Sequence, residues 1–162
     1  MENRIEILRR EIDNLIIEKQ WDKDKFFYTR MHVSHLYGVS HFCALLAVRR
    51  NLNVEIAVTC GMLHDIYPLT HDDYKNHALK GAEQAEAILK SMKLYKDEES
   101  EIITTAVSRH SEKDKIHGVY DELLKDADVL SHCFYNINFT ADEKEIERYR
   151  NLLIELGCSP VE

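Results

Sequence analysis

A histidine and an aspartate stand side by side at His64-Asp65, directly after an apolar run from Ile56 to Leu63. A run of this kind indicates a segment of the core, so the pair is expected to be buried. A carboxylate in an apolar interior is strongly destabilising unless it has a cationic partner or binds a metal ion. The pair His64-Asp65 therefore predicts a bound cation.

Two other side chains that can bind metal lie in apolar surroundings. His35 stands in the middle of a predicted helix, and Asp128 follows Asp126 in the sequence Asp-Ala-Asp-Val-Leu. Asp126 and Asp128 are about 200° apart on a helical wheel, so a single inward face can use only one of them. Periodicity alone leaves that choice open.

The order of these residues resembles the HD-domain superfamily of metal-dependent phosphohydrolases, whose pattern is a His, an adjacent His-Asp pair and a distant Asp. The surrounding sequences match as well, as His-Leu-Tyr-Gly-Val, Gly-Met-Leu-His-Asp-Ile and Asp-Ala-Asp-Val-Leu. The resemblance spans about residues 30 to 130. It implies that a divalent metal ion is bound by His35, His64, Asp65 and Asp128.

The same resemblance implies a reaction. Two imidazoles and two carboxylates suit Mn, Fe, Co, Ni or Zn and leave coordination positions for water. A bound ion lowers the pKa of its water and neutralises charge on phosphoryl oxygens. We therefore expect one or two ions and a metal-activated water that hydrolyses a nucleotide or a related small phosphoester. One divalent ion with Asp65 and Asp128 sums to zero charge, so a phosphate dianion needs a further cationic element.

Five residues are candidates for that element. His77 and His110 resemble the additional histidines of HD enzymes, which bind a second metal or orient phosphate, and either of them is a candidate to protonate the leaving group. Arg30 resembles the Arg that often precedes the first His as a clamp on substrate phosphate. Lys80 and Arg109 are neighbouring alternatives for substrate binding. The other histidines near the motifs are predicted to lie outside the site: His32, His41, His117 and His132.

One departure from the family concerns the residues after the pair. Many HD enzymes continue His-Asp-Ile-Gly-Lys, whereas this chain continues Ile66-Tyr67-Pro68. The missing Lys argues against the branch that cleaves cyclic di-GMP, and the ligand set looks closer to the small stand-alone branch that hydrolyses nucleotides or dinucleoside polyphosphates. Two alternatives remain: a non-catalytic HD module that binds nucleotide and metal and acts through a partner protein, and a purely structural bundle without metal.

The elements that must position these residues are predicted to be helices. Only five Gly and two Pro occur, and strictly alternating strand patterns are missing, so the fold class is all-α. We expect one domain over residues 1–162, a compact bundle of about six to seven helices, with a loop from 69 to about 76. The predicted helices cover about residues 2–19, 25–50, 54–66 after an Asn53 N-cap, 77–92, 97–110, 118–136 and, after a capping box at 140–143, the stretch to Gly157.

The amino-acid composition indicates which kinds of binding partner to expect. The chain has 29 acidic and 21 basic residues and a formal net charge of −8, with no cationic cluster denser than Arg49-Arg50. General nucleic-acid binding is therefore not expected, because phosphate-backbone affinity needs several clustered cations. The sequence shows no uncharged apolar stretch near the roughly 20 residues that cross a bilayer and no signal peptide, so no membrane partner and a cytoplasmic location are expected.

Two smaller features complete the expectations. The four cysteines are widely spaced and are predicted to be reduced structural thiols rather than metal ligands. Apolar residues recur at spacings of three and four along the first helix, which indicates either a core face or the seam of a homodimer. These residues are Ile5, Leu8, Ile12, Leu15 and Ile16.

Overall fold

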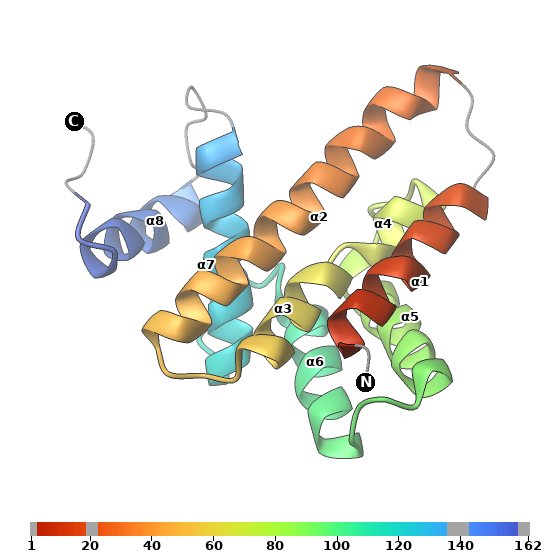
Figure 1. The fold of residues 1–162 in the computed structure, drawn as a ribbon. Coiled ribbons are helices and arrows are strands. Elements are labelled where there is room, and N and C mark those ends of the chain that lie inside the picture. The colour runs from red at the N-terminus through yellow and green to blue at the C-terminus, as the bar shows by residue number, and fades with distance from the viewer. Residues whose placement is uncertain (1–2, 19–22, 136–142, 159–162) are drawn as a thin grey trace.

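A computed structural model describes residues 3–18, 23–135 and 143–158, and the side chains of all of these except residues 23–28. Within these ranges the chain forms eight helices and no strand, which confirms the all-α class (Figure 1). The helices are α1 (Arg4–Glu18), α2 (Lys23–Arg49), α3 (Val54–Leu63), α4 (Ile66–His71), α5 (His77–Met92), α6 (Asp97–Arg109), α7 (Val119–Tyr135) and α8 (Glu143–Glu155).

The one helix that the sequence did not predict is α4, which occupies the start of the predicted loop. The chain turns helical again at Ile66, and Pro68 is tolerated because it lies in the first turn, where its missing N–H has no helical partner to lose. The connection to α5 is thereby shortened to residues 72–76, which begin and end with Asp72 and Asn76 in the left-handed conformation. His64-Asp65 thus occupies the break between two helices. The predicted N-cap of α3 is confirmed, since Asn53 accepts from two backbone N–H groups, whereas most of the predicted capping box at 140–143 lies outside the described residues.

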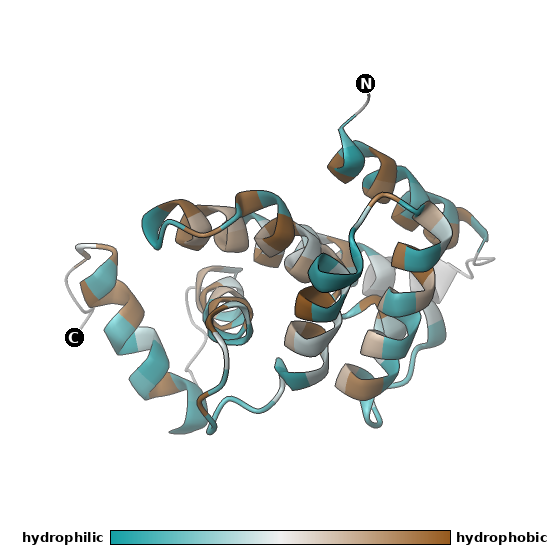
Figure 2. Ribbon diagram, turned by 90° about the horizontal axis from the view of Figure 1, so that it is seen from below, coloured by the Kyte–Doolittle hydropathy of each residue, from teal (hydrophilic) through white to brown (hydrophobic). Residues whose placement is uncertain are grey.

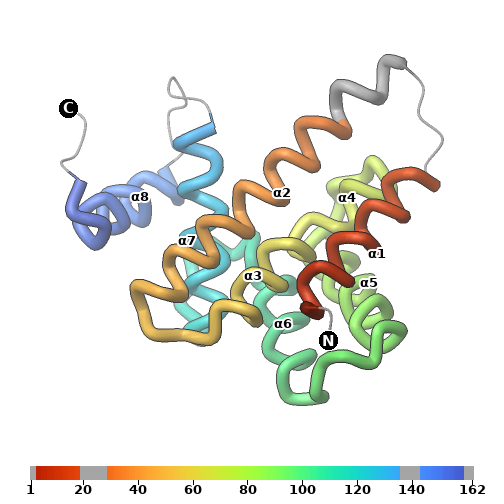
Figure 3. The backbone as a smooth tube through the Cα atoms, viewed as in Figure 1, coloured from red at the N-terminus to blue at the C-terminus, as the bar shows by residue number. Residues whose placement is uncertain are grey.

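The centre of the bundle is formed by α2, α3 and α7. Figures 1 and 3 show α2 crossing α7 and α3 running beside α2, with α5 and α6 on one side and α8 beside α7 on the other. The closest approach lies at Gly61, where an added Cβ would come within 2.6 Å of the Ser40 Cα. Only a glycine allows α3 to lie this close to α2, and that contact brings His64 opposite His35.

The apolar character of α2 exceeds what we expected. Over Thr29–Arg49 this helix is long and apolar enough, by length and composition, to span a membrane. Figure 2 shows hydrophobic residues in brown interspersed with hydrophilic residues in teal along the helices of the bundle. The expectation that no such stretch exists is therefore wrong. Core helices of soluble proteins meet the same criterion, and one side of α2 buries Leu36, Val39 and Leu46 in the core. The absence of a membrane partner stays a prediction.

Most of the cysteines and the apolar stripe of α1 are part of the core. Cys43, Cys60 and Cys133 are buried free thiols, and Cys158 is free and exposed. In α1, Ile5, Leu8 and Ile12 are buried in the core, and Leu15 and Ile16 pack against it. The stripe therefore forms a core face, and a homodimer stays a prediction.

Polar contacts at its first residue also hold α1 in place. Arg4 makes a bidentate pair with Glu99 at 2.8 and 2.9 Å, contacts Glu55 at 2.8 Å and lies over the Tyr95 ring. The hydrogen bonds from Arg4 lower the pKa of Glu99 from 4.5 to about 2. Helix α1 is thereby tied to α3 and α6.

The depressed pKa of Glu99 predicts a pH-dependent contribution to stability. Since the pKa is lower in the folded state, the contribution is present above about pH 4.5 and is lost as the pH falls toward about 2. Glu99→Gln should lower the free energy of unfolding by about 1 kcal/mol at pH 7, and the difference should shrink across that window. Urea unfolding followed by circular dichroism at several pH values measures it. The control is Glu98→Gln, in the same first turn but exposed; equal effects of both variants would contradict the assignment.

Candidate metal centre

Six residues from separate elements converge at one end of α3. His35 comes from α2, His64-Asp65 from the break between α3 and α4, His77 from the first residue of α5, His110 from the C-cap of α6, and Asp128 from α7. The structure therefore brings together all six residues that the sequence analysis singled out as metal ligands.

The imidazole rings are oriented by their Nδ1 atoms. Main-chain carbonyls lie 2.8, 2.7 and 3.1 Å from the Nδ1 of His64, His110 and His77, respectively. Since a carbonyl only accepts, each of these Nδ1 atoms donates, and the Nε2 of the neutral ring carries a lone pair. The Nδ1 of His35 lies 3.1 Å from the Ser131 hydroxyl. Such contacts fix metal-binding histidines in the tautomer that binds through Nε2.

The Nε2 atoms face one another in two pairs. His35 and His64 are 3.3 Å apart at Nε2, and His77 and His110 are 3.1 Å apart. Two lone pairs at this distance repel unless a proton or a cation lies between them. Asp65 Oδ1 and Asp128 Oδ1 are buried and have no hydrogen-bond partner within the described part of the chain. The donor atoms therefore fit a cation.

The distances form two groups that share Asp65. Its Oδ2 lies 3.6 Å from His64 Nε2 and 4.0 Å from His35 Nε2. Its Oδ1 lies 3.4 Å from His110 Nε2 and 3.7 Å from His77 Nε2. Ligands bound about 2.1 Å from one ion are roughly 3.0 to 3.4 Å apart, so each group is close to the spacing of a coordination sphere.

Asp128 completes the first of these groups. Its Oδ1 lies 3.1 Å from His35 Nε2 and 3.9 Å from His64 Nε2. On the opposite side of α7, Asp126 is also buried, but it pairs with Arg50 and Arg148 at 2.7 and 2.6 Å. The two aspartates thus face different neighbours, as their helical separation predicted, and Asp128 is the one at the cluster.

The protonation states suit metal binding. Burial lowers the pKa of His64 to about 4, so this ring is neutral at pH 7. Burial opposes ionisation of Asp128, but the Lys113 ammonium and the neighbouring imidazoles, His35 first among them, together outweigh it and hold the pKa of Asp128 well below its usual range. Burial likewise opposes ionisation of Asp65, but His64 and His110 outweigh it and lower the pKa of that carboxyl. Both carboxylates are ionised at neutral pH.

Two cavities open beside the cluster, and Asp65, Tyr74 and His132 line both. The polar cavity, of about 340 Å³, is additionally lined by His77, His110, Ser111, Lys113, Asp128, Lys144 and Glu145. The aromatic cavity, of about 400 Å³, is additionally lined by Met31, His32, His35, Ser131 and Tyr135.

His132 belongs to the site although the sequence analysis placed it outside. Its Nε2 lies 3.5 Å from Asp128 Oδ1, and its Nδ1 lies 3.3 Å from Glu145 Oε1 on α8. Its ring stacks on His35, with centroids 5.0 Å apart and an interplanar angle of 5°. The spacing of four residues from Asp128 on one helix was the available signal, because such residues share a face.

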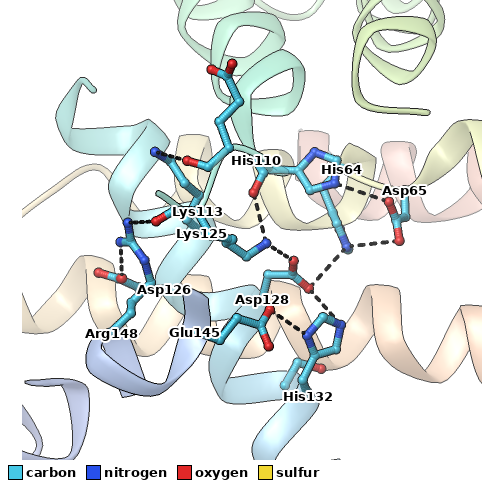
Figure 4. Close-up of polar contacts among 12 residues, drawn as sticks. His64, Asp65, His110, Lys113, Lys125, Asp126, Asp128, His132, Glu145 and Arg148 are labelled. Atoms are coloured by element: carbon cyan, nitrogen blue, oxygen red, sulfur yellow. Dashed lines mark hydrogen bonds and ion pairs between the residues drawn. The ribbon is translucent and has the colours of Figure 1, made fainter. Parts of the chain in front are cut away.

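Lys113 is the second residue that the sequence analysis missed. Its Nζ lies 2.5 Å from Asp128 Oδ2 and donates to the His110 carbonyl at 2.9 Å (Figure 4). It comes from the polar segment between α6 and α7, where the sequence carries no periodic signal.

The three predicted phosphate-binding cations are placed differently. Lys80 pairs with Asp73 at 2.8 Å, and Arg109 pairs with Asp121 at 2.9 Å. Arg30 is exposed on α2. Among the described side chains that line the two cavities, none of these three occurs. Their role in substrate binding stays a prediction, and Lys113 and Lys144 are the ammonium groups at the polar cavity.

Two cations, the buried Lys125 and the half-buried Arg148, hold the loop of Lys113. Lys125 is fully buried; its Nζ donates to the carbonyls of Glu112 and Lys115 at 3.2 and 2.8 Å and pairs with Glu122 at 2.6 Å. Arg148 of α8 donates to the Lys113 carbonyl at 3.1 Å. Figure 4 shows both cations on the side of Lys113 that faces away from His64 and Asp65.

Replacing the buried ammonium should destabilise this loop. Lys125→Met keeps the side-chain volume but leaves the carbonyls of Glu112 and Lys115 without this donor and removes one of the two cations that pair with Glu122. The free energy of unfolding should therefore fall by about 3 kcal/mol. Lys90→Met is the control, since Lys90 forms an exposed pair with Glu86 on α5, and it should change stability by less than about 0.5 kcal/mol. Urea unfolding measures both, and a Lys125→Met protein as stable as the control would refute the role of Lys125.

Comparisons with known proteins agree with this geometry. A family model described as HD domain matches residues 33–132. Ribonuclease Y of Geobacter sulfurreducens is 30% identical over 133 residues, covering 82% of this chain and 24% of that protein. Ribonuclease Y of Pelobacter propionicus is 31% identical over 105 residues, covering 64% and 18%. The chain thus spans about a quarter or less of the length of these relatives.

A solved structure shares the whole fold. The crystal structure of a predicted HD superfamily hydrolase from an uncultured Thermotogales bacterium superposes with a TM-score of 0.59 and covers 96% of both chains at 22% identity. The similarity at this identity concerns the fold.

Proposed function

The chain belongs to the HD domain family, and on that premise we propose that it is a metal-dependent phosphohydrolase acting on a nucleotide or a related small phosphoester. The observation that carries the proposal is that Asp65 belongs to two groups of donor atoms, one with His35 and His64 and the other with His77 and His110. Within each of these groups the donor atoms lie within 4.8 Å of one another. A cytoplasmic location and the absence of nucleic-acid and membrane partners remain part of the proposal.

The residues divide between two ions. His35, His64, Asp128 and Asp65 Oδ2 would hold one ion, and Asp65 Oδ1, His77 and His110 would hold the other. Divalent ions such as Mn, Fe, Co, Ni or Zn supply Lewis acidity and an activated water at such a site. The two carboxylates offset half of the four positive charges, so a net charge of about +2 remains to match a phosphate dianion.

Other side chains would position the substrate. Lys113 reaches the polar cavity beside Asp128 and would attract the phosphoryl oxygens. His132 is oriented by Glu145, which is not in either ligand group, and it lines both cavities. His132 is therefore better placed than His77 or His110 to give a proton to the leaving-group oxygen. The Nε2 atoms of those two rings would be ligands of the second ion, beside Asp65 Oδ1.

The relatives named ribonuclease Y favour a second candidate, a phosphodiester bond within RNA. The net charge of −8 argues against a long polyanion, and the two cavities have the size of small-molecule sites. We therefore place the small nucleotide first.

The test combines metal analysis with a substrate panel. Protein purified without chelator should contain about two transition-metal ions per chain, and with Mn, Co, Ni, Fe or Zn it should hydrolyse nucleoside phosphates. Cleavage of an RNA oligonucleotide without turnover of mononucleotides would favour the second candidate. Bound metal and bound nucleotide without turnover of any phosphoester would favour a non-catalytic module that acts through a partner protein, and absence of stoichiometric metal would overturn the proposal.

A further inference from the structure

We propose that the aromatic cavity binds the base of the substrate, so that the substrate class is nucleoside phosphates whose base lies against α2 and α7 while the phosphate occupies the polar cavity. This inference rests on the proposed function and specifies the substrate class for the same site. It concerns the cavity that the metal ligands His35 and Asp65 line from one side.

Large exposed side chains gather at the rim of this cavity. Met31 is 36% exposed, Tyr74 57% and Tyr135 61%, and they come from α2, the segment between α4 and α5, and the end of α7. Exposed apolar side chains from three elements around one opening are typical of a binding site. Aromatic rings and a thioether offer flat, polarisable surfaces, which suit a planar heterocycle.

The walls of the cavity are held by contacts within the protein. The Tyr74 hydroxyl and His32 Nε2 are hydrogen-bonded at 2.7 Å, which ties the segment after α4 to α2. The stacked rings of His35 and His132 form the side toward the metal ligands. The cavity is therefore shaped before a ligand enters, and a preformed site needs less ordering on binding.

The charged residues that line the two cavities indicate which cavity binds the base and which binds the phosphate. Lys113 and Lys144 line the polar cavity, and the described lining of the aromatic cavity contains no Lys or Arg. The polar cavity is also lined by Asp65, Asp128 and Glu145, whose negative charge the two proposed ions would offset. A phosphate therefore suits the polar cavity, and an uncharged ring suits the aromatic cavity. Because the two cavities share Asp65, Tyr74 and His132 in their linings, they are neighbours, and the proposal is that a molecule in which a sugar separates base from phosphate occupies both.

The test compares phosphates with and without a base. With Mn²⁺ present, the four common nucleoside 5′-monophosphates and ribose 5-phosphate are assayed for kcat/KM, and Kd is measured by calorimetry for any compound that is not turned over. The preferred nucleotide should exceed ribose 5-phosphate on the order of tenfold, as expected for stacking of one base. Met31→Ala and Tyr135→Leu should reduce this ratio toward one by raising the KM or Kd of the nucleotide.

A matched control separates this effect from a general loss of stability. Leu45 is 48% exposed on the same helix as Met31 and does not line the cavity, so Leu45→Ala should keep the wild-type ratio. Equal constants for nucleotides and ribose 5-phosphate, or a ratio unchanged in both cavity variants, would overturn the inference while leaving the hydrolase intact. Tighter nucleotide binding without turnover of any phosphoester would support the base site and count against the proposed function.

Discussion

Asp65→Ala is expected to abolish binding of both proposed metal ions and to reduce the proposed phosphohydrolase activity on the order of a thousandfold or more. The reason is that Asp65 presents one oxygen to each group of ligands, with Oδ2 toward His64 and Oδ1 toward His110. No other residue in the described part of the chain belongs to both of these groups. Elemental analysis of the purified variant and assays with added Mn²⁺ measure the two losses.

A matched control removes an aspartate elsewhere. Asp114 is exposed in the segment between α6 and α7, and Asp114→Ala should retain metal and activity. Circular dichroism should show that both variants are folded, since removing Asp65 also removes a costly buried charge. A folded Asp65→Ala protein with wild-type activity would refute the mechanism.

His110→Ala is expected to separate the two ions. His110 is 2% exposed, and its Nε2 faces His77 and Asp65 Oδ1, so its loss removes a ligand from the second group alone. The variant should retain about one ion per chain, and its activity should fall on the order of a hundredfold because one ion alone leaves less charge to stabilise the phosphoryl group.

Metal content distinguishes this result from the alternatives. His77→Ala should give the same stoichiometry as His110→Ala, since both residues belong to one group. His41→Ala provides the control, because His41 is exposed on α2, and it should keep two ions. Loss of both ions in His110→Ala would indicate one coupled centre, and retention of both would exclude His110 as a ligand.

The sequence was informative where local pattern and burial coincide. His64-Asp65 follows an apolar run, and a core segment that ends in a charged pair admits few explanations, so the pair is identifiable from the order of residues alone. His35 and Asp128 followed from their order in the family pattern. The fold class followed from the periodicity of apolar residues, which reports directly on helical faces.

The remainder depends on contacts between distant segments. Lys113 reaches Asp128 across 15 residues from an aperiodic loop, and the length of a lysine side chain makes its end point unpredictable from spacing. Lys80 and Arg109 are near ligands in sequence but are directed to Asp73 and Asp121. The helix α4 was missed because a proline usually ends a helix, whereas Pro68 lies in a first turn.

The last helix has a consequence for how the chain can be altered. Through Glu145 and Arg148, α8 contacts His132 and the backbone of Lys113, so a segment that supplies no metal ligand still sets the orientation of two side chains in the polar cavity. Exchanging α8 for that of a relative should therefore change the substrate preference and leave the metal content unchanged. Sequence variation in α8 can thus alter which substrate is bound while the metal ligands stay the same.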